Sequence, residues 1–440
     1  MGSGFAAVPD EQVYRLANAT IPVCLVDECA LAGNSDGLAR ADVLIQAGRV
    51  SAVEPPGTEA SAVPSLDLDG GMVWPCMVDM HTHLDKGHIW PRQSNPDGTF
   101  EGALTAVRAD RGENWSRRDL SARMDFALRS AYAHGTKAIR THLDTYPGQI
   151  GITWPLFADI RDRWTGRIAL QAACLTAIDQ AFDDALMAET VKALKAHGGL
   201  LGSVTFMIPE IRDALGRLFK MAGDNGFDLD FHVDETGDPE AHSLRLIAET
   251  ALETRFSGRI TVGHCCSVAK QPVDEAMRTL DLVAEAGLAV VSLPMCNLYL
   301  QDRRPGATPR WRGVTLLHEM QARQIPVAIA SDNTRDPFYA YGDLDGLEVF
   351  REATRILHLD HPFGSWPKSI TSTPASIMGL TEAGTIRIGG SADMILFRAR
   401  TWTELLSRPQ SDRTVLRAGK PIDTTLPDYR ELDCVLGEPT

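Results

Sequence analysis

Two histidines separated by one residue, His81 and His83, are the side chains in this sequence with the clearest capacity for chemistry. They follow a run that starts at Gly71 as an apolar, uncharged segment with valines, which is typical of a buried strand. Residues i and i+2 of a strand point to the same face, so both imidazoles can bind one metal ion. The alternative is that one histidine packs in the core and the other faces solvent. The pair indicates a metal site and predicts further ligands at other strand ends.

Polar residues do follow other apolar, strand-like runs. They are His142, His232, Glu235, His264 and Asp332. Each has an ordinary alternative: a core or hydrogen-bonding histidine, or, for Asp332, a helix cap. Together, three or four nitrogen and oxygen ligands from different strands would form an open site for a divalent cation.

The types of these residues suit hydrolysis. A bound dication lowers the pKa of its water from about 15.7 to near 7, which gives hydroxide at neutral pH. Glu235 lies three residues beyond His232 and can carry protons between that water and a ring nitrogen, while His264 and Asp332 hold the water or accept its proton. Unrelated zinc deaminases also use a glutamate beside an activated water. The pattern predicts hydrolysis, in which water attacks an electrophilic carbon.

The segment between about residues 71 and 380 alternates short apolar runs with helical patterns, which indicates βα units around a parallel sheet. Helices are predicted, for example, over Asp119–Ala133 and Asp274–Glu285. The eight expected strands are Met72–Met80, Lys137–His142, Ile168–Leu175, Leu200–Met207, Asp228–Val233, Ile260–His264, Leu288–Leu293 and Pro326–Ala330. Eight strands in this length predict an α/β fold, a (β/α)8 TIM-type barrel with its active site at the C-terminal strand ends. An open doubly wound sheet is the alternative, but no glycine-rich phosphate fingerprint follows any strand.

The two ends of the chain read as β structure. Short β-branched runs occupy Ile21–Asp27 and Ala41–Val53, and a glycine-punctuated strand pattern returns at Gly384–Phe397. We expect a small β-sandwich module built from residues 1–70 and 381–440, and a barrel domain over residues 71–380.

Composition sets broad limits on partners and location. The formal net charge of −15 argues against nucleic acid or an anionic membrane as partner. The 8 cysteines, at positions 24, 29, 76, 174, 265, 266, 296 and 434, have no CxxC spacing, which indicates buried thiols in a reducing cytoplasm. Residues 1–9 lack an export signal and no apolar run approaches a membrane span. Expected partners are a small-molecule substrate and, in a homo-oligomer, further copies of the chain.

The motifs resemble those of the amidohydrolase superfamily, in particular its cytosine deaminase-like branch of purine, pyrimidine and triazine deaminases. The resemblance runs through nearly the whole chain, over His81–Asp85, Ile139–Asp144, His232–Glu235, His264, Asn297–Gln301, and Asp332 with Asp336–Phe338. It implies that His81, His83, His232 and Asp332 bind one metal ion, zinc or iron with zinc favoured, that Glu235 carries protons, and that His264 orients the attacking water. A binuclear relative would have a bridging lysine at the end of strand four, whereas this strand ends Val204–Met207, so one metal per chain is expected.

Departures from the branch concern the substrate. A glutamine that holds cytosine's amide edge in the family corresponds here to Ala177, the second aspartate after the metal ligand is Asn333, and an aromatic position is Phe338. We predict substrate contacts from Lys86, His142, Asn333 and Phe338. Lys86 and the nearby His88 could equally belong to a solvated loop.

These observations predict a metal-dependent hydrolytic deaminase of an amino-substituted N-heterocycle that releases ammonia. Cytosine or a related pyrimidine is the leading substrate, with a pterin or aminotriazine as further candidates. The alternatives are a dihydroorotase-like cyclic amide hydrolase of the same superfamily and a non-catalytic barrel scaffold.

Overall fold

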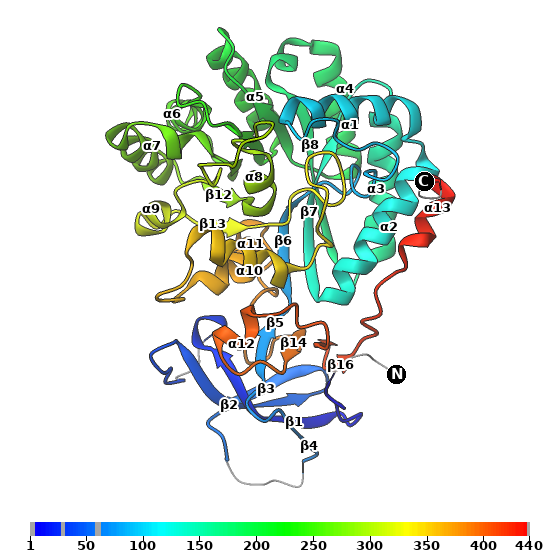
Figure 1. Ribbon diagram of the computed structural model, residues 1–440, viewed down its shortest axis with the longest axis vertical. Coiled ribbons are helices and arrows are strands. Elements are labelled where there is room, and N and C mark those ends of the chain that lie inside the picture. Colours follow the sequence, from blue (N-terminus) through cyan, green and yellow to red (C-terminus); the bar gives the residue numbers. More distant parts are fainter. Residues whose placement is uncertain (1–4, 28–30, 58–62, 438–440) are drawn as a thin grey trace. The chain divides into compact units, whose positions relative to one another are not determined.

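A computed structural model of the chain describes residues 5–27, 31–57 and 63–437. It contains two eight-stranded sheets, with strands and helices labelled in Figure 1. By its internal contacts the chain divides into two compact units: Met1–Asp79, Arg129–Ala138 and Leu344–Pro427 in one, and Met80–Leu128, Ile139–Asp343 and Asp428–Thr440 in the other. The domain boundaries after residues 70 and 380 stay a prediction.

One of the two sheets is a barrel of parallel strands in sequential order. Its strands are β6 (Met77–Thr82), β7 (Thr136–Asp144), β8 (Ala169–Ala177), β9 (Leu201–Thr205), β10 (Leu229–Val233), β11 (Ile260–His264), β12 (Ala289–Ser292) and β13 (Val327–Ile329). A parallel bridge between Thr82 and Asp332 joins the first strand to the segment after the last. The predicted TIM-type barrel is therefore confirmed.

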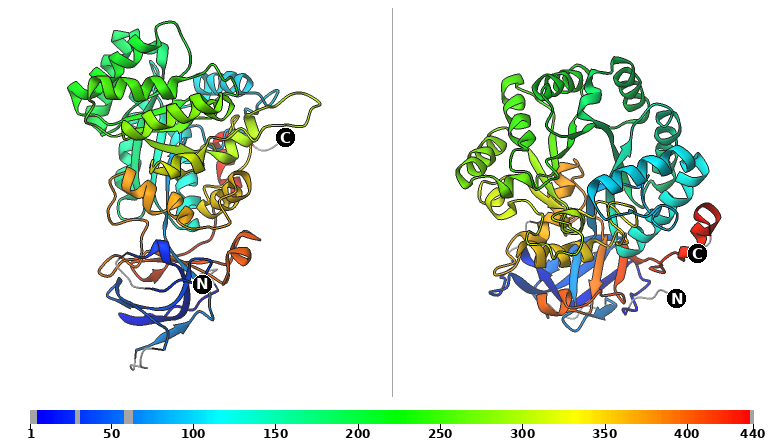
Figure 2. Two further views of the ribbon diagram at one scale, coloured as in Figure 1. Left: turned by 90° about the vertical axis from the view of Figure 1, so that its left-hand side faces the viewer. Right: turned by 45° about the horizontal axis from the view of Figure 1, so that its top comes forward.

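Helices lie between the barrel strands and form a ring around them in the right-hand view of Figure 2. They are α1 (Phe100–Asn114), α2 (Arg117–His134), α3 (Ile150–Trp164), α4 (Asp184–His197), α5 (Ile211–Asn225), α6 (Ser243–Thr254), α7 (Val273–Glu285), α8 (Pro294–Leu300) and α9 (Leu317–Ala322). The helix α5 shows why such segments pack on a barrel, because it buries Ala214, Leu215 and Leu218 along one face and ends at Gly226 in the left-handed conformation. After β13 follow α10 (Gly346–Leu357) and α11 (Ser372–Ile377).

The second sheet is built from both ends of the chain, as the sequence predicted. Its strands are β1 (Val13–Pro22), β2 (Leu38–Gln46), β3 (Arg49–Glu54), β4 (Ser65–Asp67), β5 (Met72–Pro75), β14 (Met394–Phe397), β15 (Thr414–Arg417) and β16 (Lys420–Pro421). Its core includes Leu16, Ile21, Val43, Leu396 and Leu416. The strand predicted over Met72–Met80 is divided in the structure, since β5 pairs with β14 in this sheet and β6 begins the barrel.

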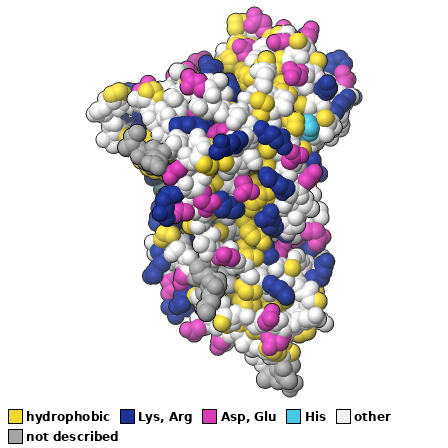
Figure 3. All heavy atoms as spheres, turned by 90° about the vertical axis from the view of Figure 1, so that its right-hand side faces the viewer, with side chains coloured by type: hydrophobic (Ala, Val, Ile, Leu, Met, Phe, Trp, Pro, Cys, Tyr) yellow, Lys and Arg dark blue, Asp and Glu magenta, His cyan; other side chains and the backbone are white. Residues whose placement is uncertain are grey.

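The surface and the thiols agree with ordinary globular packing. Acidic and basic side chains are interspersed on the face drawn in Figure 3. The described cysteines are free thiols, and five of them are buried; Cys29 lies outside the described residues. Among the described helices, each is too short or too polar to cross a lipid bilayer.

Candidate active site

Four predicted metal ligands converge at the C-terminal end of the barrel. Nε2 of His232, at the end of β10, lies 3.1 Å from Nε2 of His81 and 3.2 Å from Nε2 of His83, both from the end of β6. Oδ1 of Asp332 lies 3.2 Å from Nε2 of His83 and 3.6 Å from Nε2 of His81. All four side chains are buried.

These spacings fit a single divalent cation. Four ligand atoms about 2.1 Å from a central ion, arranged as a tetrahedron, would lie about 3.4 Å from one another. The measured separations of 3.1–3.6 Å scatter around that value. Three imidazole nitrogens that face one another and a carboxylate need a shared positive charge at their centre, so the donor set fits zinc or a similar ion.

The histidines are held in the form that can bind a cation. Burial, together with neighbouring imidazoles, lowers the pKa of His81 and His232 well below the usual range. Burial and the nearby Lys86 do the same to the pKa of His83. Neutral imidazoles keep a nitrogen lone pair, which a metal ligand requires.

Gly263 of β11 lies against the ring of His81 and leaves no room there for a side chain. A Cβ at Gly263, on β11, would lie 2.8 Å from Cε1 and 3.1 Å from Nδ1 of the His81 ring. Any larger residue would therefore displace a ligand, which links the sequence of β11 to the position of the site.

Glu235 lies beside the ligand cluster and is joined to His264 through a residue that the sequence motifs contained without an assigned role. Nδ2 of Asn297, in α8, donates to Oε1 of Glu235 at 3.1 Å and lies 3.0 Å from Nδ1 of His264. Asn297 is fully buried. Its signal in the sequence was a polar residue just after the seventh strand, in the segment Asn297–Gln301.

The protonation of Glu235 and His264 is strongly shifted. Burial, and then the Asp332 carboxylate, raise the pKa of Glu235 well above its usual range. Burial, and then His142, lower the pKa of His264 to about 3. A carboxyl group whose pKa is raised, beside a neutral imidazole, suits proton transfer.

Several residues of the site have left-handed backbones. His264, Cys265 and Asp332 have φ of 67°, 50° and 64°. Such conformations are unfavourable for residues with a Cβ and persist where the surroundings hold them. Here the Asp332 amide donates to the His81 carbonyl at 2.9 Å, which fixes one ligand relative to another.

The structure also places the four predicted substrate contacts. A nitrogen of His142 joins those of His81, His83 and His232 within 4.8 Å, and its Nε2 contacts Asp230 at 3.0 Å. The sequence reasoning missed Asp230, which also pairs with Arg140 at 2.8 Å and so fixes the His142 ring from inside the barrel.

Lys86 is buried and its Nζ lies 2.9 Å from Oδ1 of Asp144 and 3.2 Å from Nδ1 of His83. It is therefore part of a buried charge pair behind the predicted ligand His83, and the solvated-loop alternative is wrong for this residue. Asp144 was another residue without an assigned role in the sequence motifs.

Asn333 and Phe338 follow Asp332 on the same loop. Nδ2 of Asn333 donates to Oδ2 of Asp336 at 2.7 Å. The Phe338 ring packs edge-on against Phe100 with 5.4 Å between centroids, and Nζ of Lys86 lies 5.8 Å from its centre. Substrate contact by these residues and by His142 stays a prediction.

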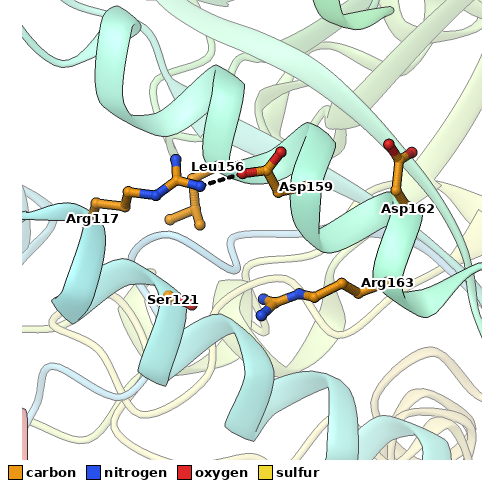
Figure 4. A pocket seen from close by; sticks show the side chains of 6 residues that line it. All are labelled: Arg117, Ser121, Leu156, Asp159, Asp162 and Arg163. Carbon is orange, nitrogen blue, oxygen red and sulfur yellow. Dashed lines mark hydrogen bonds and ion pairs between the residues drawn. The ribbon is translucent and has the colours of Figure 1, made fainter.

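A separate surface pocket lies between α2 and α3, and Figure 4 shows its lining. Arg117 pairs there with Asp159, and both side chains are more than half exposed. The lining combines exposed charges with Leu156 and Ser121 and lacks the buried, convergent groups of the barrel site.

The barrel carries a cluster of buried histidines that is able to hold a divalent cation. The sequence model of the amidohydrolase family matches residues 65–147 and 158–423, and the chain belongs to that family. It is 54% identical over 438 residues to a pterin deaminase of Rhizobium rhizogenes, covering 99% of this chain and 100% of the relative. It is 24% identical over 356 residues, 78% of this chain and 83% of the relative, to an N-isopropylammelide isopropyl amidohydrolase of a Pseudomonas species.

Solved structures share the fold. A 5-methylcytosine deaminase from Klebsiella pneumoniae has a TM-score of 0.79 at 20% identity, covering 93% of this chain and 97% of that one. An N-isopropylammelide isopropylaminohydrolase from Burkholderia multivorans has a TM-score of 0.73 at 24% identity, covering 94% and 100%. The protein is thus a hydrolase of carbon–nitrogen bonds, a deaminase of the amidohydrolase superfamily.

Proposed function

We propose that this protein hydrolytically deaminates a pterin, using one divalent cation held by His81, His83, His232 and Asp332. The observation that carries the reaction is the position of Glu235, bridged by Asn297 to His264 and lying beside the ligand cluster. Zinc is the cation we favour, because the donor set is three imidazoles and one carboxylate.

A cation in this site would supply Lewis-acid activation of a water molecule. Glu235 accepts a proton from the water molecule. The water oxygen then attacks the ring carbon that carries the amino group. Glu235 then delivers the proton to the adjacent ring nitrogen. His264 orients the water, and its Nε2 has no hydrogen-bond partner among the described residues, which leaves it available.

The second proton of the water passes to the amino group as the carbon–nitrogen bond breaks. The products are ammonia and the ring with an oxo group in place of the amine, so atoms and charge balance. Asp332 lies against both His81 and His83 and is placed to hold or accept this proton during transfer.

Two observations favour a pterin as the substrate: the residues at the end of β8 and the similarity to a pterin deaminase. A pterin contains an aminopyrimidinone fused to a second ring, so its site needs more room than a site for cytosine. Ala177 presents only a methyl group where the family's cytosine-binding glutamine stands. Its backbone N–H is not free to donate to a substrate, because it donates to Oε1 of Gln180 at 2.9 Å. The 54% identity to a pterin deaminase favours the same choice over cytosine.

Other expectations stay predictions: a cytoplasmic location, no nucleic-acid partner, and self-association. Cyclic amide hydrolysis is the less favoured reaction, because Thr205, which ends β9, cannot supply the carboxylated lysine of binuclear relatives.

The test is ammonia release from purified, metal-loaded protein against pterin, cytosine, isocytosine and an aminotriazine, with metal counted on the same sample. Turnover of pterin with about one metal ion per chain is the expected result. Turnover of cytosine but not pterin would overturn the choice of ring. Metal binding without ammonia from any of the compounds would overturn deamination.

A further inference from the structure

The segment Asp428–Leu436, here called the C-terminal brace, belongs to the same compact unit as the active site although it follows the terminal sheet in sequence. It consists of a 3-10 turn at Tyr429–Leu432 and the short helix α13 (Asp433–Leu436), drawn in red beside α2 in Figure 1. None of its residues takes part in the proposed reaction.

Two arginines fasten the end of the brace to the barrel. Nη1 of Arg92 donates to the Val435 carbonyl at 3.1 Å, and Nη2 of Arg118 donates to the Cys434 carbonyl at 3.4 Å. Arg92 is itself fixed by Asp110 at 2.7 Å. The brace is therefore attached at a definite place and is not a loose tail.

Tyr429 is the residue of the brace that reaches the active-site loops. Its ring stacks on Phe126 of α2, with 5.4 Å between centroids and 29° between planes. The guanidinium carbon of Arg335 lies 4.0 Å from the ring centroid, and the His88 ring lies 6.4 Å away.

The two loops that meet at Tyr429 are those of the metal ligands. His88 lies five residues after His83, and Arg335 lies three residues after Asp332. The loops are joined to each other, because the His88 amide donates to the Thr334 carbonyl and the Trp90 amide to the Arg335 carbonyl, both at 2.9 Å.

This junction is strained and needs external support. His88 and Arg335 have left-handed backbones, with φ of 68° and 48°. His88 is 1% exposed, and neither ring nitrogen has a hydrogen-bond partner among the described residues, so packing alone holds its ring. Phe126 and Tyr429 supply that packing, and Tyr429 also covers the Arg335 guanidinium.

We propose that Tyr429 is a positioning residue of the active site, which holds the His83 loop and the Asp332 loop at the separation that the bound cation requires. It acts through His88 and Arg335 and does not touch the substrate. The inference rests on the proposed metal site and not on the identity of the ring.

The test measures metal release from the cation-loaded protein to an excess of chelator, without substrate. Tyr429→Ala is expected to release the ion about tenfold faster than the wild type, the size of effect seen when groups supporting a metal ligand are removed. Tyr429→Phe keeps the ring contacts and is expected to stay near the wild-type rate. In the cobalt-substituted protein, Tyr429→Ala should also change the visible absorption bands.

Two further variants separate positioning from general loss of stability. Leu16→Ala removes packing from the core of the terminal sheet and is expected to lower the unfolding temperature without altering metal release. Arg335→Ala removes the other half of the stacked pair, so the double variant with Tyr429→Ala should release metal no faster than the worse single variant.

The proposal would be overturned if Tyr429→Ala released metal at the wild-type rate. It would also be overturned if Leu16→Ala accelerated metal release as much as Tyr429→Ala does. Because no substrate is present, the proposal can fail in a protein that deaminates pterin, and it can hold in one that does not. The two proposals are therefore tested separately.

Discussion

Glu235 and His264 lie 3.4 Å apart, from Oε1 to Nδ1, and the side-chain amide of Asn297 connects them. The three groups come from the ends of β10 and β11 and from α8, which follows β12. One amide thus sets the orientation of both the proposed proton carrier and the proposed water-orienting residue.

Removing this amide should impair catalysis and move its pH dependence. Asn297→Ala takes a hydrogen-bond donor from Glu235, and that donor lowers the pKa of the carboxyl. Its loss raises the pKa further, so a higher pH is needed to reach the carboxylate that accepts a proton. We expect kcat to fall about tenfold to a hundredfold and the acidic limb of the kcat/KM profile to shift upward. Leu298→Ala, an exposed neighbour, is the control, and an unchanged profile in Asn297→Ala would contradict the assignment.

Glu235→Gln should abolish turnover and leave metal binding intact. The amide has nearly the shape of the carboxylate but cannot accept the water's proton, so kcat should fall by about 10²–10⁴. Metal content by atomic spectroscopy should match that of the wild type, since Glu235 is outside the four-ligand set. Turnover at the wild-type rate would remove Glu235 from the mechanism.

Gly263→Ala tests the position of His81 with a single methyl group. The new Cβ would lie 2.8 Å from Cε1 of His81, so the ring must move away from the other ligands. We expect metal content and activity to fall by at least about tenfold while far-ultraviolet circular dichroism is retained. The matched control is Gly216→Ala in α5, where a Cβ meets nothing within 4 Å; it should stabilise the protein by up to about 1 kcal/mol. Full metal content in Gly263→Ala would contradict the packing argument.

Asp345 predicts an acid-sensitive contribution to stability. Its carboxylate pairs with Arg413 through two contacts, at 2.7 and 2.6 Å. Burial alone would raise the pKa of Asp345, but Arg413 and then His134 lower it from 3.8 to about 2. The unfolded chain therefore takes up the proton first, and the stabilisation is present above about pH 4 and lost between about pH 4 and pH 2.

Urea unfolding of the wild type and Asp345→Asn at several pH values measures this effect. The difference in free energy of unfolding should be about 3–5 kcal/mol near neutral pH, because the variant leaves Arg413 buried without its charge partner. It should shrink by about 2 kcal/mol from pH 4 to pH 2. A difference that does not depend on pH in that range would show that the ion pair is not the cause.

The sequence alone predicted the barrel and the identity of the residues that the structure brings together. Apolar periodicity is a local property, so it located eight strands and the β segments at both ends. The ligand types are also local: His81 and His83 lie two residues apart on one strand, and the parallel arrangement of barrel strands brings their C-terminal ends to one place. The convergence of His232 and Asp332 with them followed from the order of the strands.

Only the tertiary structure decided the contacts between distant segments. It divided the strand at Met72–Met80 between two sheets, because the partner of β5 is β14, more than three hundred residues away. It placed Asn297 between Glu235 and His264, set Asp144 against Lys86, and brought Tyr429 to the loops of His88 and Arg335. Such contacts depend on how elements pack in space, so they leave no periodic signal in the sequence. Strand patterns and the spacing of the ligands, in contrast, depend on residues that are close together in the sequence.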